Sequence, residues 1–159
     1  AQHGTTVQAF TESIDVTPTI LDWIGQDVPA GIDGVSLRPF LEGKGPTKWR
    51  DCVHLELDYS EPDEVTIWQQ AAGVSTHEAN LAILREERFK LVHFNGDLPP
   101  MLFDLKADPS ELNDLAGDPA HAPTLLRLTR KLLSHRMKHA DRTLADVRIT
   151  PEGVVGYTP

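Results

Sequence analysis

Apolar and polar residues alternate along several segments in the middle of the chain. Over residues 53–59 every second side chain is apolar, which is the period of a β-strand with one apolar and one polar face. The segment 84–94 is predicted to form a strand, a tight turn and an inner strand, with the polar pair Glu86-Glu87 at the turn. A further strand is expected from Met101, because Pro99-Pro100 lacks the N–H groups that would continue a ladder.

Helical signals lie on both sides of these strands. A helix is expected over residues 13–25, because Pro18 suits a first helical turn and Gly25 can adopt the left-handed conformation that ends a helix. The longest helix is expected to begin at Asp118 or Ala122 and to reach His139, because leucines recur there at helical spacing. Together, these strands and helices predict an α+β chain.

Three shorter segments carry local signals. Residues 7–10 are expected to form a short strand, and residues 65–68 fit either a short strand or the start of a helix. Asp108 stands where a helix N-cap belongs, with Pro109 at the first helical position and Glu111 three residues after the cap. We therefore expect a helix to begin after Asp108.

Composition and charge narrow the range of partners. Lysine plus arginine total 15 against 24 aspartate plus glutamate, a net charge of -9, which argues against nucleic acid or an anionic membrane as a partner. No apolar run approaches the ~20 residues of a membrane span. The one cysteine, Cys52, excludes an internal disulfide and a thiolate zinc cluster, so a reducing, cytoplasmic location is expected.

The length of 159 residues suffices for one domain, or for one domain with a piece of another. The first strongly apolar segment, 7–24, has no preceding strand on which to pack. Neither an initiator methionine nor the apolar core of a signal peptide is present near Ala1. We therefore expect the chain to be a piece of a larger protein.

One face of the predicted strand 53–59 carries candidate metal ligands. His54, Glu56 and Asp58 share this face, and imidazole and carboxylate groups suit several divalent ions. Alternation alone also produces such a face, so a polar face that is solvated, or covered by a polar neighbour, is the favoured interpretation.

A second candidate lies on the long predicted helix. His135 and His139 stand four residues apart, a spacing that can hold a metal. No carboxylate general base stands between them, and Arg136 and Lys138 would repel a cation. A metal role for this pair is therefore disfavoured.

Candidate nucleophiles are equally few. Cys52 and His54 form the one local dyad, without a third group to orient the imidazole, so a packed cysteine is favoured. Asp15 is easily mistaken for a catalytic residue, but a role in helix capping or in bonding the backbone is favoured. G-x-S-x-G and H-E-x-x-H motifs are absent from the sequence. The residues alone predict no complete active site.

Several blocks of the sequence nevertheless resemble a known family. They are similar to the C-terminal blocks of the type I sulfatases, in the alkaline phosphatase superfamily, and comprise residues 15–22, 33–41, 88–92 and 102–115. The last block is similar to the family signature LYDL..DP.E..NL. The blocks 49–51, 54–56 and 136–144 resemble more narrowly the arylsulfatase/phosphonate monoester hydrolase branch.

The resemblance implies a parent enzyme that hydrolyses sulfate esters, or alternatively phosphonate monoesters or phosphodiesters. In that family a cysteine or serine within C/S-x-P-x-R becomes formylglycine, and a divalent cation, calcium or manganese, polarises the ester. Neither feature has a counterpart in this sequence. We therefore assign no catalytic, cofactor-binding or metal residue, and expect the chain to be inactive alone, with a structural and substrate-rim role.

The resemblance also implies an architecture. Residues 1–45 would end a large N-terminal α/β domain and keep one of its helices. Residues 46–139 would form a smaller domain, an antiparallel sheet of about four strands with the long helix packed on it. Residues 140–159 would form an extended arm that joins copies into a homo-oligomer, while the rest of the sulfatase chain is the other expected partner. A stand-alone, non-enzymatic assembly module is the alternative.

Overall fold

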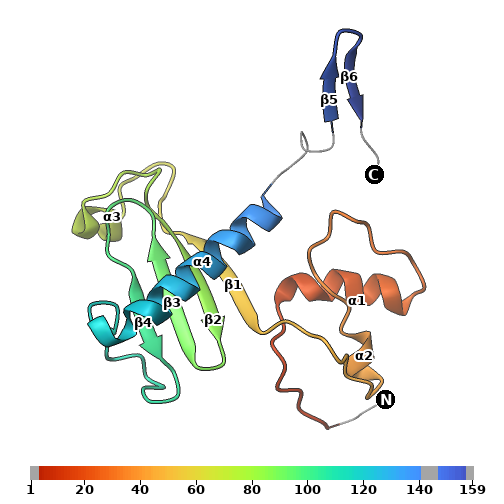
Figure 1. Cartoon of the computed structure of the whole chain (residues 1–159), viewed down its shortest axis with the longest axis horizontal. Coiled ribbons are helices and arrows are strands. Elements are labelled where there is room, and N and C mark those ends of the chain that lie inside the picture. Colours follow the sequence, from red (N-terminus) through yellow and green to blue (C-terminus); the bar gives the residue numbers. More distant parts are fainter. Residues whose placement is uncertain (1–3, 141–146, 157–159) are drawn as a thin grey trace.

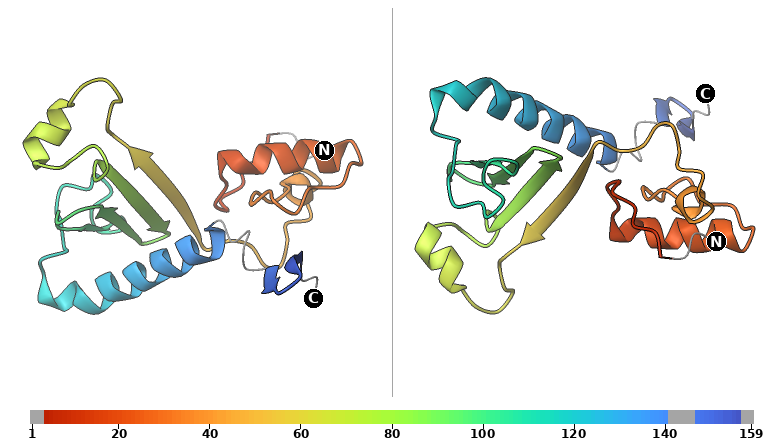
Figure 2. Two further views of the ribbon diagram at one scale, coloured as in Figure 1. Left: turned by 90° about the horizontal axis from the view of Figure 1, so that it is seen from above. Right: turned by 90° about the horizontal axis from the view of Figure 1, so that it is seen from below.

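A computed structural model describes residues 4–140 and 147–156 of the chain (Figure 1). Four strands form one antiparallel sheet in the order β1-β2-β3-β4, and they are β1 (Cys52–Asp58), β2 (Asn80–Glu86), β3 (Phe89–Phe94) and β4 (Met101–Asp104). The long helix α4 (Ala122–His139) crosses one face of this sheet (Figure 2). The predicted α+β class, the antiparallel sheet and the long helix packed on it are confirmed.

The other elements lie outside this sheet. Before β1 the chain forms η1 (Ser13–Asp15), α1 (Val16–Trp23) and α2 (Arg38–Leu41). In chain order, α3 (Ile67–Ala72) separates β1 from β2, and η2 (Pro119–His121) precedes α4. A separate two-stranded hairpin consists of β5 (Val147–Thr150) and β6 (Gly153–Gly156). Across the described ranges, no helix combines the length and the apolarity that a membrane crossing requires.

A small leucine-rich core joins the sheet to α4. Its buried members are Ala82, Leu84, Leu91, Leu102, Leu128 and Leu132. Burying one such leucine stabilises the fold by about 1.5–3 kcal/mol. On α4, Leu128 and Leu132 are buried whereas Leu126 and Leu133 remain exposed, so only one stripe of the helix meets the sheet.

The strand register decides which side chains of β1 face the helix. His54 lies opposite Leu84, and Glu56 lies opposite Ala82, in the β1–β2 ladder. Directly opposite residues share a face of the sheet, so the polar side chains of β1 point to the face that α4 covers. Leu55 and Leu57 therefore lie on the other face, where they are 51% and 55% exposed.

The segment before β1 is organised by a buried carboxylate. Asp15 accepts hydrogen bonds from the backbone N–H groups of Glu12 at 2.8 Å and Val35 at 2.9 Å, and pairs with Arg50 at 2.6 Å. This is the backbone-bonding role predicted for Asp15. The helix predicted over 13–25 is present as η1 and α1, and Gly25 adopts the predicted left-handed conformation with φ of 74°.

Two sequence predictions are wrong. Residues 7–10 form no strand. No helix follows Asp108, because its carboxylate accepts hydrogen bonds from the N–H groups of Leu112 and Asn113, at 2.7 and 2.8 Å, and holds the segment in a turn. Glu111, expected inside that helix, has a positive φ of 55°, which a right-handed helix does not allow.

One further prediction needs adjusting, and one open alternative is decided. The turn of the β2–β3 hairpin is Glu87-Arg88, one residue later than predicted, because Glu86 still belongs to β2. Its carboxylate is held there by Arg127 and Lys131 of α4. Residues 65–68, for which strand and helix were both open, lead into α3, and Thr66 caps that helix by accepting a hydrogen bond from the N–H of residue 69 at 3.2 Å.

Candidate functional site

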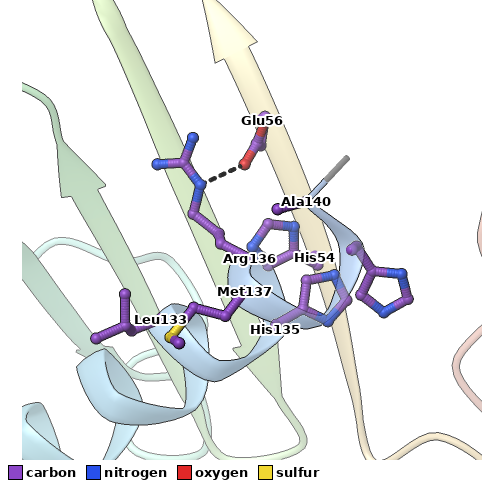
Figure 3. Close-up of a pocket in the computed structure, with 8 residues that line it drawn as sticks. His54, Glu56, Leu133, His135, Arg136, Met137 and Ala140 are labelled. Carbon is purple, nitrogen blue, oxygen red and sulfur yellow. Dashed lines mark ion pairs between the residues drawn. The ribbon is translucent and has the colours of Figure 1, made fainter. Parts of the chain in front are cut away.

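A pocket lies where β1 meets the last turns of α4 (Figure 3). Its volume is about 610 Å³, and it is lined mainly by His54, Glu56, His135, Arg136, Met137 and His139. Both candidate groups from the sequence, His54 with Glu56 and His135 with His139, therefore lie in one place. Asp58, the third member of the strand group, does not line this pocket, and its carboxylate accepts a hydrogen bond from the N–H of Ser60 at 2.9 Å.

The three histidines of the pocket form a row of stacked rings, which we call the histidine row. The ring centroids of His54 and His135 are 4.1 Å apart with an interplanar angle of 23°. Those of His135 and His139 are 4.3 Å apart at 32°. The row continues to the N-terminal segment, because Nδ1 of His139 lies 2.8 Å from Oδ1 of Asp33.

Burial disfavours protonation of His54 and His135. Burial lowers the pKa of His54, and its buried Nε2 has no hydrogen-bond partner in the part of the chain that the structure describes. Burial, followed by the neighbouring His54 and His139, lowers the pKa of His135 to about 4. His135 is therefore neutral at pH 7, which suits a ring packed between two other imidazoles.

Carboxylates and cations around the row are already paired. Nε of Arg136 lies 3.0 Å from Oε1 of Glu56, an ion pair drawn in Figure 3. Glu12 forms an ion pair with Arg50, and its Oε1 also accepts a hydrogen bond from the backbone N–H of His54 at 3.0 Å. These contacts join the N-terminal segment, β1 and α4 at one seam.

The geometry of the row does not fit a metal centre. Among residues 4–140 and 147–156, no group of three or more His, Cys, Asp or Glu side chains is placed to hold a metal ion. Ring nitrogens of stacked imidazoles lie in nearly parallel planes, whereas metal ligands must converge on one point. We therefore derive no chemical step through a metal from these residues.

Cys52 is packed rather than activated. It lies partly buried against the leucine-rich core. Burial raises the pKa of its thiol, so the nucleophilic thiolate is disfavoured. These properties fit a packed side chain better than a nucleophile paired with His54.

The other notable surface is the uncovered face of the sheet. Its centre is an apolar hollow of about 280 Å³, lined by Leu57, Tyr59, Trp68, Ala72, Leu81, Phe94 and Leu98. We call this hollow, together with Leu55, the open face. Trp68 is 66% exposed, and the buried hydroxyl of Tyr59 finds no hydrogen-bond partner within the described ranges. Contiguous exposed apolar surfaces are common at interaction sites, so this surface is a candidate for one.

α1 presents a second apolar surface. Ile20, Trp23 and Ile24 are exposed along it, although they form the apolar side of an amphipathic helix. The described residues therefore form a domain with an open sheet, a helix on one face of it and exposed apolar surfaces.

Comparison with known proteins identifies that domain. Residues 1–138 match the family model described as "N-sulphoglucosamine sulphohydrolase, C-terminal", and the chain belongs to this family of sulfatase C-terminal domains. The sulfatase resemblance predicted from the sequence blocks is confirmed.

Two relatives with known names are similar over most of the chain. The multifunctional alkaline phosphatase superfamily protein PehA of Trinickia caryophylli is 44% identical over 156 residues, which cover 95% of this chain and 29% of that protein. The N-acetylglucosamine-6-O-sulfatase of Bacteroides thetaiotaomicron is 33% identical over 141 residues, covering 87% of this chain and 23% of that protein.

A solved structure shares the fold. The phosphonate monoester hydrolase SpPMH from Silicibacter pomeroyi superposes with a TM-score of 0.83 at 52% identity, covering 96% of this chain and 30% of that one. The chain thus spans less than a third of the length of each of these relatives.

Sequence reasoning missed the histidine row. It treated His54 as part of a strand face and the His135/His139 pair as part of a helix, without placing the two together. No local sequence signal could have found the row, because it depends on the register of β1 against β2, which turns His54 toward α4.

Proposed function

We propose that this chain is the C-terminal part of a hydrolase of sulfuric esters, and that it supplies structure and part of the substrate rim rather than reacting groups. The supporting observation is the family match over residues 1–138, combined with coverage of less than a third of each relative. The relatives are long enough to hold a further, larger domain beside the matched part.

The described side chains give a physical reason for inactivity of the chain alone. Ester hydrolysis needs a nucleophile, an activating group and charge stabilisers that converge on one point. Here the Cys52 thiol is protonated and packed, the histidines stack on one another, and Glu12 and Glu56 are paired with arginines. On this proposal, formylglycine and a calcium or manganese ion belong to the rest of the hydrolase.

The rest of the hydrolase is also the proposed partner of the open face and of α1. Leu55, Leu57 and Trp68 are each at least half exposed in this chain. Covering them by another domain would remove apolar surface from water at about 25 cal/mol per Å².

A second copy of the chain is the proposed partner of the C-terminal arm. Within residues 140–159, the structure describes the β5–β6 hairpin, which extends away from the four-stranded sheet (Figure 1), while residues 141–146 and 157–159 lie outside the described part. An isolated two-stranded hairpin is only marginally stable in water. Removing residues 140–159 is expected to lower the number of chains per particle that light scattering gives, and an unchanged number would contradict this partner.

A phosphonate monoester hydrolase is the second candidate for the parent activity. The observation that favours it is the difference in identity, 52% with the phosphonate monoester hydrolase SpPMH against 33% with the N-acetylglucosamine-6-O-sulfatase. Both candidates assign the same structural role to this chain.

An activity assay tests the proposal. The chain alone, and the same chain joined to the product of the reading frame directly upstream, are assayed with an aryl sulfate and an aryl phosphonate ester, each with calcium or manganese. We expect turnover only by the joined protein, and the preferred ester decides between the two candidates. Turnover by the chain alone, or an upstream frame without C/S-x-P-x-R, would overturn the proposal.

A further inference from the structure

The histidine row connects three parts of the chain that are distant in sequence. His54 belongs to β1, His135 and His139 belong to the last turns of α4, and Asp33 belongs to the segment between α1 and α2. The leucine-rich core reaches along α4 only to Leu132. Beyond that residue, the row provides the ring contacts that hold the end of α4 against β1.

His135 is the central ring of the histidine row, and it lies among acidic and basic side chains. The acidic groups at the seam, from the N-terminal segment and β1, are Glu12, Asp33 and Glu56. The basic groups, from the approach to β1 and from α4, are Arg50, Arg136 and Lys138. Cys52 is the remaining titratable group on the β1 side.

Each of the acidic groups is already engaged. Glu12 pairs with Arg50, Glu56 pairs with Arg136, and Asp33 pairs with His139. A proton added to His135 therefore meets an imidazole on each side, and Lys138 beside it, without an unengaged carboxylate in the described surroundings. Two stacked imidazole rings can pack together while they are neutral. Two positively charged rings at these centroid distances repel each other.

We propose that the histidine row is an acid-sensitive latch, in which protonation of His135 releases the last turn of α4 from β1 and from the N-terminal segment. α4 ends at His139, and β5 begins at Val147, so the latch controls the helix end that precedes the β5–β6 hairpin. The inference concerns this chain's own seam and does not depend on the proposed hydrolase activity.

The direction of the pH effect follows from proton binding. With the latch closed, the pKa of His135 is about 4, whereas a free histidine titrates near its ordinary value of about 6.5. Between these values the released state binds more protons than the closed state. Lowering the pH through this window therefore favours release, and above it the latch is insensitive to pH.

The test is amide hydrogen exchange of the full chain, corrected for intrinsic exchange, at pH 7.5 and at about pH 4.5, with imidazole titration followed by NMR. We expect protection of residues 135–139 to fall on the order of 50- to 100-fold at the lower pH, since about two pKa units lie between the free value and pH 4.5 and each unit corresponds to tenfold. Protection at Leu128 and Leu132, in the core, should change much less.

Two variants separate the latch from general acid effects. His135→Gln cannot be protonated and should lose the pH step, while His135→Phe keeps an aromatic ring in the stack and should hold the helix end at both pH values. His77→Gln, at an exposed loop position, is the matched control and should keep the step. The same pH step in His135→Phe, or titration of His135 near 6.5 with unchanged protection, would overturn the proposal.

Discussion

Side chains along β1 alternate between the two faces of the sheet, but α4 covers one face while the other face is exposed. The face under α4 carries the leucine-rich core, yet at its β1 edge it is polar, with His54 and Glu56 against the helix. The open face is apolar along the same strand, but Leu55 and Leu57 remain about half exposed. Alternation thus shows that a strand has two different faces, but it does not identify what covers each of them.

The difference between the two faces predicts different effects of substitutions on stability. The covered face and the seam next to it hold the chain together by burial and by paired charges, so substitutions there should destabilise the chain itself. The open face contributes little to the isolated chain, so substitutions there should act on the proposed assembly with the rest of the hydrolase. The predictions below test this contrast, beginning with the largest effect.

Arg50→Ala is expected to cause the largest loss. The guanidinium of Arg50 is the cationic partner of Asp15, whose side chain is fully buried, and removing one partner of a buried pair costs about 3–5 kcal/mol. Urea unfolding measures the loss. The matched control is Arg136→Ala, whose pair with Glu56 is more than half exposed, at 55% and 54%, and should cost less than ~1 kcal/mol. Equal losses would contradict the distinction between a buried and an exposed ion pair.

Leu128→Ala should follow closely. Leu128 is fully buried between α4 and the sheet, and truncating a buried leucine costs about 2–5 kcal/mol. On the open face, Leu57→Ala should shift the unfolding midpoint of the isolated chain only slightly. A comparable loss for Leu57→Ala would mean that the open face is already packed within this chain.

Acid should weaken the seam before the core. Although burial alone raises the pKa of Asp15, hydrogen bonds from the N–H groups of Val35 and Glu12 and the neighbouring Arg50 hold it below its ordinary value. The resulting stabilisation is complete above the unfolded pKa of about 3.9 and is lost as the pH falls through the lower, folded value. In urea unfolding between pH 7 and pH 3, Asp15→Asn should show a flatter pH dependence, and an unchanged slope would contradict this role.

Leu57→Lys should have the smallest effect on the chain alone. At a surface position the free energy of unfolding should change by at most about 0.5 kcal/mol. In the joined hydrolase the same charge would lie in an apolar interface, so the thermal midpoint of the joined protein should fall. Equal midpoints of the joined variant and its parent would show that the open face stays in water.

Much of this fold was predictable from local patterns. Both the strand at 53–59 and the helix α4 follow from patterns among residues that are close in the sequence. These patterns are the alternation of apolar residues in the strand and the leucine spacing in the helix, so both elements were predicted. The helix after Asp108 was predicted wrongly, because the Asp108 carboxylate bonds the backbone of Leu112 and Asn113, an alternative to capping that uses the same residue type. The histidine row needed the strand register and the position of α4, which are long-range features that no local pattern shows.

The most direct test of the central claim is hydroxyl-radical labelling of tryptophan in the chain alone and in the joined hydrolase. Trp68 lies on the open face and is 66% exposed, whereas Trp49 packs against Phe40 and donates a hydrogen bond to the carbonyl of Phe10 at 2.6 Å. The account predicts that labelling of Trp68 falls sharply in the joined protein while Trp49 is labelled weakly in both. Equal labelling of Trp68 in both proteins would contradict the claim that the rest of the hydrolase covers this face.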